Sequence, residues 1–192
     1  MGNRRIGRKR LYGVEKQGQS VDLEAGAGIS GAIARATQHR QGQELITEIL
    51  IDLGTSTQDI EGGGTNAFTI GVNGGGVAGH ITQLTVAKYG IITEIRAVVL
   101  ETATQHDLDL VTGDAAVNVK AAVTGNRTVI IDDMGEKGAD QSALPAAFHA
   151  NMQDGTEAYL YICNGASEAS AADQDAGKYA IYIHGFAAPA DL

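Results

Sequence analysis

The sequence predicts a mainly β protein that forms an antiparallel β-sandwich, of which the jelly roll is one form. About eight runs of β-branched and aromatic residues alternate in polarity, and the 26 glycines fall largely between them. Helical patterns are few and short, so helices could not cover a parallel sheet. A chain of 192 residues is long enough for one hydrophobic core. Two antiparallel sheets packed face to face are therefore the expected way to bury these strands.

The expected strands follow the apolar runs in chain order, at residues 44–53, 67–72, 80–87, 89–101, 117–123, 128–132, 158–163 and 178–186. The fourth run alternates most clearly: one face is expected to hold Tyr89, Ile91, Ile95, Ala97 and Val99, and the other Ile92, Glu94, Arg96 and Val98. Glycine-rich segments between the runs have the composition of turns. The small, polar residues 164–176 are expected to form an exposed loop.

Two segments have the pattern of a short helix. Residues 29–37 form the first. The second is expected over residues 143–153, with Ser142 as its N-cap and Pro145 in the first turn, where proline is tolerated.

Charge divides the chain into a basic arm, residues 1–16, and an acidic single domain, residues 17–192. The arm has six Lys or Arg residues against Glu15, a balance of +5, which leaves −14 of the total of −9 for the rest. A nucleic-acid surface would repel such a body, so we expect the arm to bind protein. The alternative is a terminus that only adds solubility.

Composition also bears on location. No run of eighteen apolar residues could span a membrane, and the basic start is not followed by the apolar segment of a signal peptide, so we expect a soluble protein that is not exported. The single cysteine, Cys163, excludes an intrachain disulfide, and its place in an apolar run indicates a buried thiol on a strand. Assembly in a reducing cytoplasm is compatible with this.

The motif most suggestive of an enzyme is G-x-G-x-x-G over residues 26–31, with Asp52 about twenty residues further on. A dinucleotide site needs an apolar strand before the turn and a helix whose N-terminus faces the pyrophosphate. Here the preceding run is short and charged, and no further βαβ unit follows. We therefore expect a glycine-rich surface loop and keep dinucleotide binding as the minor alternative.

Other residues give no metal or catalytic constellation. The five histidines lack ligand spacing, and the acidic pairs Asp107/Asp109 and Asp173/Asp175 lack the downstream glutamate of a calcium loop, so they are expected to be solvated turns. Cys163 lies in an apolar run, away from any helix N-terminus. We expect His184 to be a hydrogen-bonded structural histidine. The prediction is a protein without enzymatic activity, cofactor or metal.

Five segments carry a resemblance: RRIGRKRLYGVEKQGQ (4–19), ATQHRQGQE (36–44), IDLGTS (51–56), QLTVAKYGIITEIRAV (83–98) and YIHGF (182–186). Together they resemble small virion structural proteins of marine tailed phages. The resemblance implies a capsid decoration or cement protein that self-associates, often as a trimer, and binds the major capsid protein or other virion proteins. The virion would then be its location, after assembly in the host cytoplasm.

In that role the arm would bind the shell. Its cations would pair with shell carboxylates, and its apolar side chains would anchor it; the residues are Arg4, Arg5, Ile6, Arg8, Lys9, Arg10, Leu11 and Tyr12. Two other classes remain open. One is a different virion component, a tail or head-fibre subunit, although the sequence has neither repeats nor coiled-coil heptads. The other is a stand-alone domain: carbohydrate binding is disfavoured by the absence of tryptophan, and enzymatic activity by the lack of a convergent polar constellation.

Overall fold

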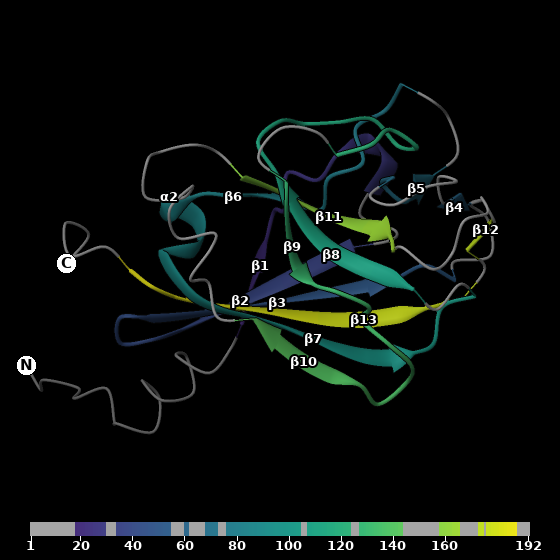
Figure 1. The fold of residues 1–192 in the computed structure, drawn as a ribbon. Coiled ribbons are helices and arrows are strands. Elements are labelled where there is room, and N and C mark those ends of the chain that lie inside the picture. The colour runs from purple at the N-terminus through teal and green to yellow at the C-terminus, as the bar shows by residue number, and fades with distance from the viewer. Residues whose placement is uncertain are drawn as a thin grey trace, which may run out of the picture.

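A computed structural model describes residues 18–29, 34–54, 60–61, 68–72, 76–104, 107–123, 127–143, 158–165, 173–174 and 176–187, with only the backbone of 60–61 and 173–174. The described chain is mainly β. A larger and a smaller antiparallel sheet lie over one another, so the predicted sandwich architecture is confirmed (Figure 1).

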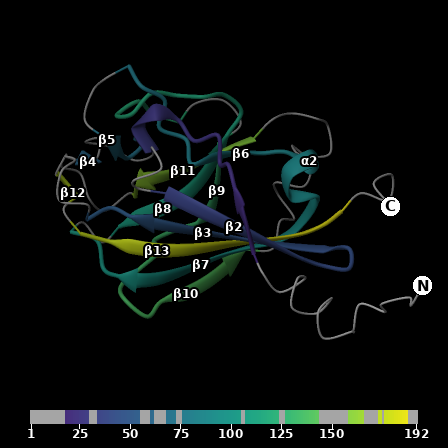
Figure 2. The same cartoon turned by 180° about the vertical axis from the view of Figure 1, so that it is seen from behind.

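The larger sheet has six strands in the order β1-β2-β3-β13-β7-β10. These are β1 (Gln19–Val21), β2 (Ala34–Gln41), β3 (Glu44–Asp52), β13 (Lys178–Phe186), β7 (Ile91–Glu101) and β10 (Asp140–Ala143). The last long strand, β13, pairs along its whole length with both β3 and β7, so the end of the described chain lies at the centre of this sheet (Figure 2). Such long-range pairing ties the two halves of the chain together.

The smaller sheet has four strands in the order β6-β11-β8-β9. These are β6 (Thr82–Leu84), β11 (Ala158–Asn164), β8 (Leu108–Gly113) and β9 (Thr128–Ile131). A third, small sheet joins β12 (Asp173–Gln174), β4 (Ile60–Glu61) and β5 (Gly71–Val72). The described helices are a 3-10 turn, η1 (Ala27–Ile29), and a single helical turn, α2 (Val86–Tyr89), which Thr85 caps by accepting a hydrogen bond from the Lys88 amide.

The main core fills the space between the two large sheets. Isoleucines dominate the inner face of the six-stranded sheet, and leucines dominate the facing strands; the most buried are Ile49, Ile95, Ile181, Leu108, Leu110 and Leu160. Alternation along β3 and β13 places these side chains inward, as the sequence pattern required. Burial of this apolar surface is the main stabilising contribution to the fold.

The four-stranded sheet is buried on both faces. A second, smaller core of Val111, Val123, Tyr161 and Cys163 lies on the face away from the six-stranded sheet. The loop over residues 114–123 contributes Val123 to this core, and the Tyr161 hydroxyl ties the loop down by donating to the Ala115 carbonyl at 2.5 Å and accepting from the Val117 amide at 3.1 Å. Since both faces are covered, β8 is buried at all six positions and shows no alternation.

Five predicted strands are confirmed with nearly the predicted bounds: β3, β7, β9, β11 and β13. Two other predicted strands are partly wrong. The run over residues 80–87 holds β6 but then turns into α2, and 117–123 forms the covering loop, with isolated bridges at Asn118 and Ala122. From the run 67–72, only β5 and bridges at Phe68 and Thr69 form.

Both helix predictions fail where the structure describes the chain. The predicted helix over 29–37 gives way to β2, which begins at Ala34 and pairs with β3 along its length. Ser142 does not cap a helix but lies in β10, opposite Arg96; residues 144–153 lie outside the described residues. In both places, pairing with a long neighbouring strand outweighed a weak helical preference.

The strand β7 contains an irregularity that corrects the predicted facing of its first residues. Its register with β13 shifts between His184/Gly185, opposite Glu94/Ile92, so that Thr93 is the extra residue of a bulge. Ile95, Ala97 and Val99 face the core as predicted, but Ile92 is also buried and Ile91 is exposed. A bulge moves every residue before it to the opposite face.

Candidate binding groove

The predicted arm falls outside the described residues. None of its eight predicted contacts can therefore be placed: Arg4, Arg5, Ile6, Arg8, Lys9, Arg10, Leu11 and Tyr12. The described chain begins at Gly18, which lies against the ring of His39 on β2.

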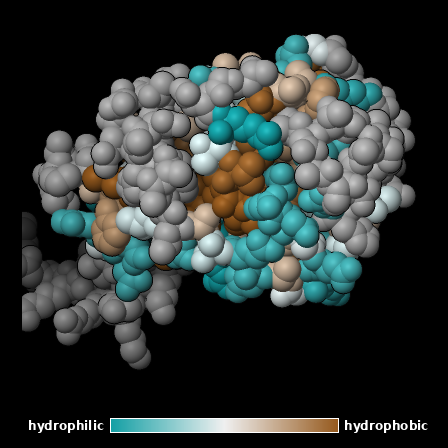
Figure 3. Space-filling view, viewed as in Figure 1, coloured by the Kyte–Doolittle hydropathy of each residue, from teal (hydrophilic) through white to brown (hydrophobic). Residues whose placement is uncertain are grey.

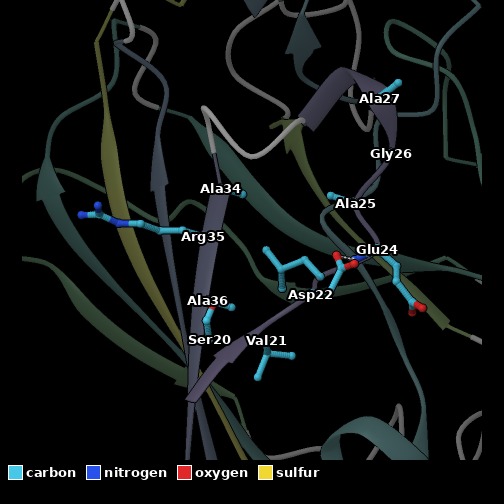
Figure 4. Close-up of a pocket in the computed structure, with 11 residues that line it drawn as sticks. Ser20, Val21, Asp22, Glu24, Ala25, Gly26, Ala27, Ala34, Arg35 and Ala36 are labelled. Carbon is cyan, nitrogen blue, oxygen red and sulfur yellow. Dashed lines mark hydrogen bonds between the residues drawn. The ribbon is translucent and has the colours of Figure 1, made fainter. Parts of the chain in front are cut away.

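A groove lies next to β1, where the chain leaves the six-stranded sheet. β1 pairs with β2 only from Gln19↔Gln38 to Val21↔Ala36. Residues 22–28 then run beside residues 78–82, with the Gly26 amide donating to the His80 carbonyl at 2.9 Å and the Gly28 amide to the Ala78 carbonyl at 2.8 Å. The space between this segment and β2 has a volume of about 460 Å³ and is lined by residues 20–27 and 34–36 (Figure 4).

Small side chains line much of the groove, and carboxylates stand on its rim. Ala25 and Ala34 lie on opposite sides, and Ala25 points toward β2 (Figure 4). Asp22 and Glu24 are exposed; the Asp22 carboxylate accepts the Glu24 amide at 2.9 Å, and the Glu24 carboxylate pairs with Lys88 Nζ at 2.9 Å. Arg35 also borders the groove, but its side chain extends away from it (Figure 4).

The edge of β2 is open along the groove. Between Ala36 and the start of β2 at Ala34, the described chain supplies no strand partner to β2 on the side away from β3. An unpaired strand edge is a template for an additional strand. The groove therefore combines a free edge, room for a main chain, and acidic side chains at the rim, which suit an extended, basic peptide.

The G-x-G-x-x-G segment is not the predicted surface loop. Gly26, Gly28 and Ile29 are buried, and a Cβ at Gly26 would lie 2.2 Å from the Ala78 carbonyl oxygen. The three-residue η1 and the strand β2 stand where a dinucleotide site needs a helix, so the described part of this segment offers no helix N-terminus to a pyrophosphate. These glycines serve close packing.

The prediction of solvated turns is wrong for Asp107 and Asp109, both of which are buried around the start of β8. Asp109 accepts a hydrogen bond from the Asp133 amide at 2.9 Å, and burial raises the pKa of its carboxyl. Asp173 lies in β12, and Asp175 is outside the described residues. In the part of the chain that the structure describes, no group of three His, Cys, Asp or Glu residues is placed to hold a metal ion.

Three other residues bear on chemistry. Cys163 is a fully buried free thiol on β11, as predicted, and burial raises its pKa. His184 is half-buried, with Nδ1 3.7 Å from the Glu44 carboxylate, a distance beyond the predicted hydrogen bond. Sequence reasoning did not single out His80, whose Nε2 lies 3.1 Å from the Glu24 carbonyl oxygen and whose ring packs edge-on against Tyr159.

A second surface feature is an apolar patch at one end of the six-stranded sheet. Ile91 and Phe186 are register partners there, and they are 44% and 45% exposed. Val86 on α2, next to this sheet end, is 42% exposed, and we call these three residues the sheet-end patch. On the face seen in Figure 3, apolar side chains also gather near the centre, among hydrophilic ones.

Comparisons of the chain with family models, curated proteins and solved structures find no match. Over the described residues, no helix is long and apolar enough to cross a membrane. The case for function therefore depends on the residues themselves. The groove is the described feature best suited to a partner, and the ionisable residues that line it are Asp22, Glu24 and Arg35.

Proposed function

We propose that this chain is a virion structural protein of a tailed phage, a capsid decoration protein that binds the major shell through its N-terminal arm and associates with copies of itself as a trimer. The proposal requires neither a catalytic residue nor a cofactor. Its shell-binding residues are those of the arm, and its body supplies the face presented to solvent.

The observation that carries the proposal is the separation of charge along the chain. The first sixteen residues balance at +5, and the remainder at −14. An acidic surface keeps neighbouring bodies soluble and disfavours contact with packaged DNA, which favours a position of the body outside the shell. A short basic arm that also carries Ile6, Leu11 and Tyr12 can combine ion pairs with apolar anchors on an acidic protein surface. The resemblance to phage virion proteins points the same way.

Two features of the body support self-association. The sheet-end patch exposes an aromatic and two aliphatic side chains close together, and exposed apolar patches commonly mark contacts between proteins. The open edge of β2 offers a second contact, through main-chain hydrogen bonds. Both are compatible with a small protein that works in many copies.

Binding of purified protein to particles that lack it tests the proposal. Deletion of residues 1–12 should abolish co-sedimentation with the particles, while the circular dichroism spectrum shows that the body stays folded. As a matched control, replacing the exposed body cations Arg40 and Lys137 by glutamine should leave binding intact. Full binding by the truncated protein would contradict the proposal.

A further inference from the structure

We infer that the groove between residues 20–27 and β2 binds the N-terminal arm of a second copy of this chain. The inference does not depend on the shell, since both the arm and the groove belong to this protein. It adds a second partner for the arm, which holds copies together in the absence of particles.

The shape of the groove suits an extended chain. Its lining includes four alanines and a glycine, with Ala25 and Ala34 on opposite sides, so a main chain can lie close to β2. β1 leaves β2 after the Val21↔Ala36 pair, and an incoming segment can continue the sheet from that point. Main-chain hydrogen bonds would provide affinity, and alternate side chains of the segment would face the groove.

Charge favours the arm as the occupant. Asp22 and Glu24 are exposed on the rim, and the third ionisable lining residue, Arg35, extends away from the groove (Figure 4). The arm carries five cations within residues 4–10, whereas residues 17–192 as a whole balance at −14. Opposite charges of this size raise the rate and specificity of association at low salt.

Chain direction favours a second copy over the protein's own arm. β1 and β2 are antiparallel, so Gly18 lies beside His39. The chain therefore enters β1 from the end of β2 that is farther from Ala34. To reach its own groove, the arm would have to reverse and pass back along β1. Fully extended, sixteen residues span about 50 Å, which is enough to cross to a neighbouring body. Arm-into-groove contacts are head-to-tail and can close into a ring, such as a trimer.

The test uses the full chain and four variants, with molar mass measured by light scattering after size exclusion. The arm variant replaces Arg4, Arg5, Arg8, Lys9 and Arg10 by glutamate. Ala25→Trp fills the groove, and the double variant D22K/E24K reverses the charge of its rim without touching the core. Ala116→Trp, at an exposed position of the covering loop outside both the groove and the sheet-end patch, is the matched control.

The wild type and Ala116→Trp should form the same oligomer, which weakens in 1 M salt because charges are then screened over about 3 Å. The arm variant and Ala25→Trp should weaken association by about tenfold or more. Mixing these two should yield a one-to-one heterodimer, since one partner keeps its arm and the other its groove. If Ala25→Trp does not fold, the rim variant takes its place in the mixture.

Three results would each overturn the inference. One is a wild type that stays monomeric at high concentration. Another is unchanged association by both groove variants, which would place the contact elsewhere. The last is a mixture of folded variants that forms no heterodimer, because the intact arm of one variant would then fail to bind the open groove of the other. A wild type that forms the oligomer but does not bind particles would instead count against the proposed shell contact alone.

Discussion

The side chain of Val119 lies directly against Gly28, and a Cβ built on Gly28 would stand 2.3 Å from Val119 Cγ2. Gly71 approaches the same methyl group from β5, where a Cβ would stand at 2.5 Å. The G-x-G-x-x-G segment, which suggested a nucleotide site, thus packs closely against Val119 of the covering loop. This close packing gives the first prediction.

Gly28→Ala should lower the free energy of unfolding by about 1–3 kcal/mol, because the added methyl overfills a packed site. Val119→Ala should lower the free energy of unfolding when it is introduced by itself. In the Gly28→Ala background the same truncation should relieve part of the clash. The double variant should therefore be more stable than the sum of the two single effects predicts, as measured by urea unfolding. Strict additivity would show that the two residues do not share the site.

His80 should make the protein less stable in mild acid. Burial lowers the pKa of His80 in the folded protein, and the buried Nδ1 has no hydrogen-bond acceptor in the described structure. The unfolded chain, with a histidine pKa of about 6.5, therefore binds the proton more readily. The stability due to neutral His80 is complete above that pKa and is lost as the pH falls below it.

Urea unfolding of the wild type and His80→Gln, at pH 7.5 and pH 5, measures this effect. The fall in stability between the two pH values should be smaller in His80→Gln. His39→Gln, at a half-buried histidine on β2, is the control and should fall as the wild type does. Equal falls in all three proteins would contradict the role given to His80.

Cys163 should be unreactive in the folded protein. Its side chain is fully buried in the second core, and burial raises the pKa of the thiol, so little thiolate is present. Labelling by a thiol reagent at pH 8 should be at least about a hundredfold slower than in denaturant, since it requires opening of the structure. Labelling at equal rates would show that this core is open to solvent.

Tyr89→Phe should destabilise the connection between α2 and β6. The Tyr89 hydroxyl lies 2.8 Å from Thr82 Oγ1, which itself donates to the Leu23 carbonyl, and both side chains are buried. Loss of the hydroxyl should cost about 1 kcal/mol in urea unfolding. Tyr182→Phe, which removes a hydrogen bond to Glu48 on the outer face of the sheet, should cost less. The reverse order would contradict this assignment.

The sequence predicted the fold class and the strands that carry most of the core. The strands β3 and β13 bury one face each, so their inward isoleucines alternate with other residues and reveal both type and bounds. Alternation fails where both faces are covered. This is why the sequence predicts a solvated acidic turn at Asp107/Asp109, although Asp109 lies in β8, whose six residues are all buried.

The hairpin of β2 and β3 shows a signal that sequence reasoning missed. Only Gly42 and Gln43 separate these two strands, and Gly42 has φ +67°, as glycine in a tight hairpin turn can. Ala34 and Ala36 alternate with Arg35 in burial, as a strand requires. The same small side chains also suit a helix, which is why the sequence pattern predicts a helix over residues 29–37. The groove could not be foreseen, because it depends on where β1 leaves β2, which no local pattern encodes.

The proposed decoration role is tested by cryo-electron microscopy of purified phage particles. We predict density for a β-rich oligomer on the outside of the head, with residues 1–16 ordered against the shell or a neighbouring copy. Density confined to the tail, or particles that do not contain the protein, would contradict the decoration role.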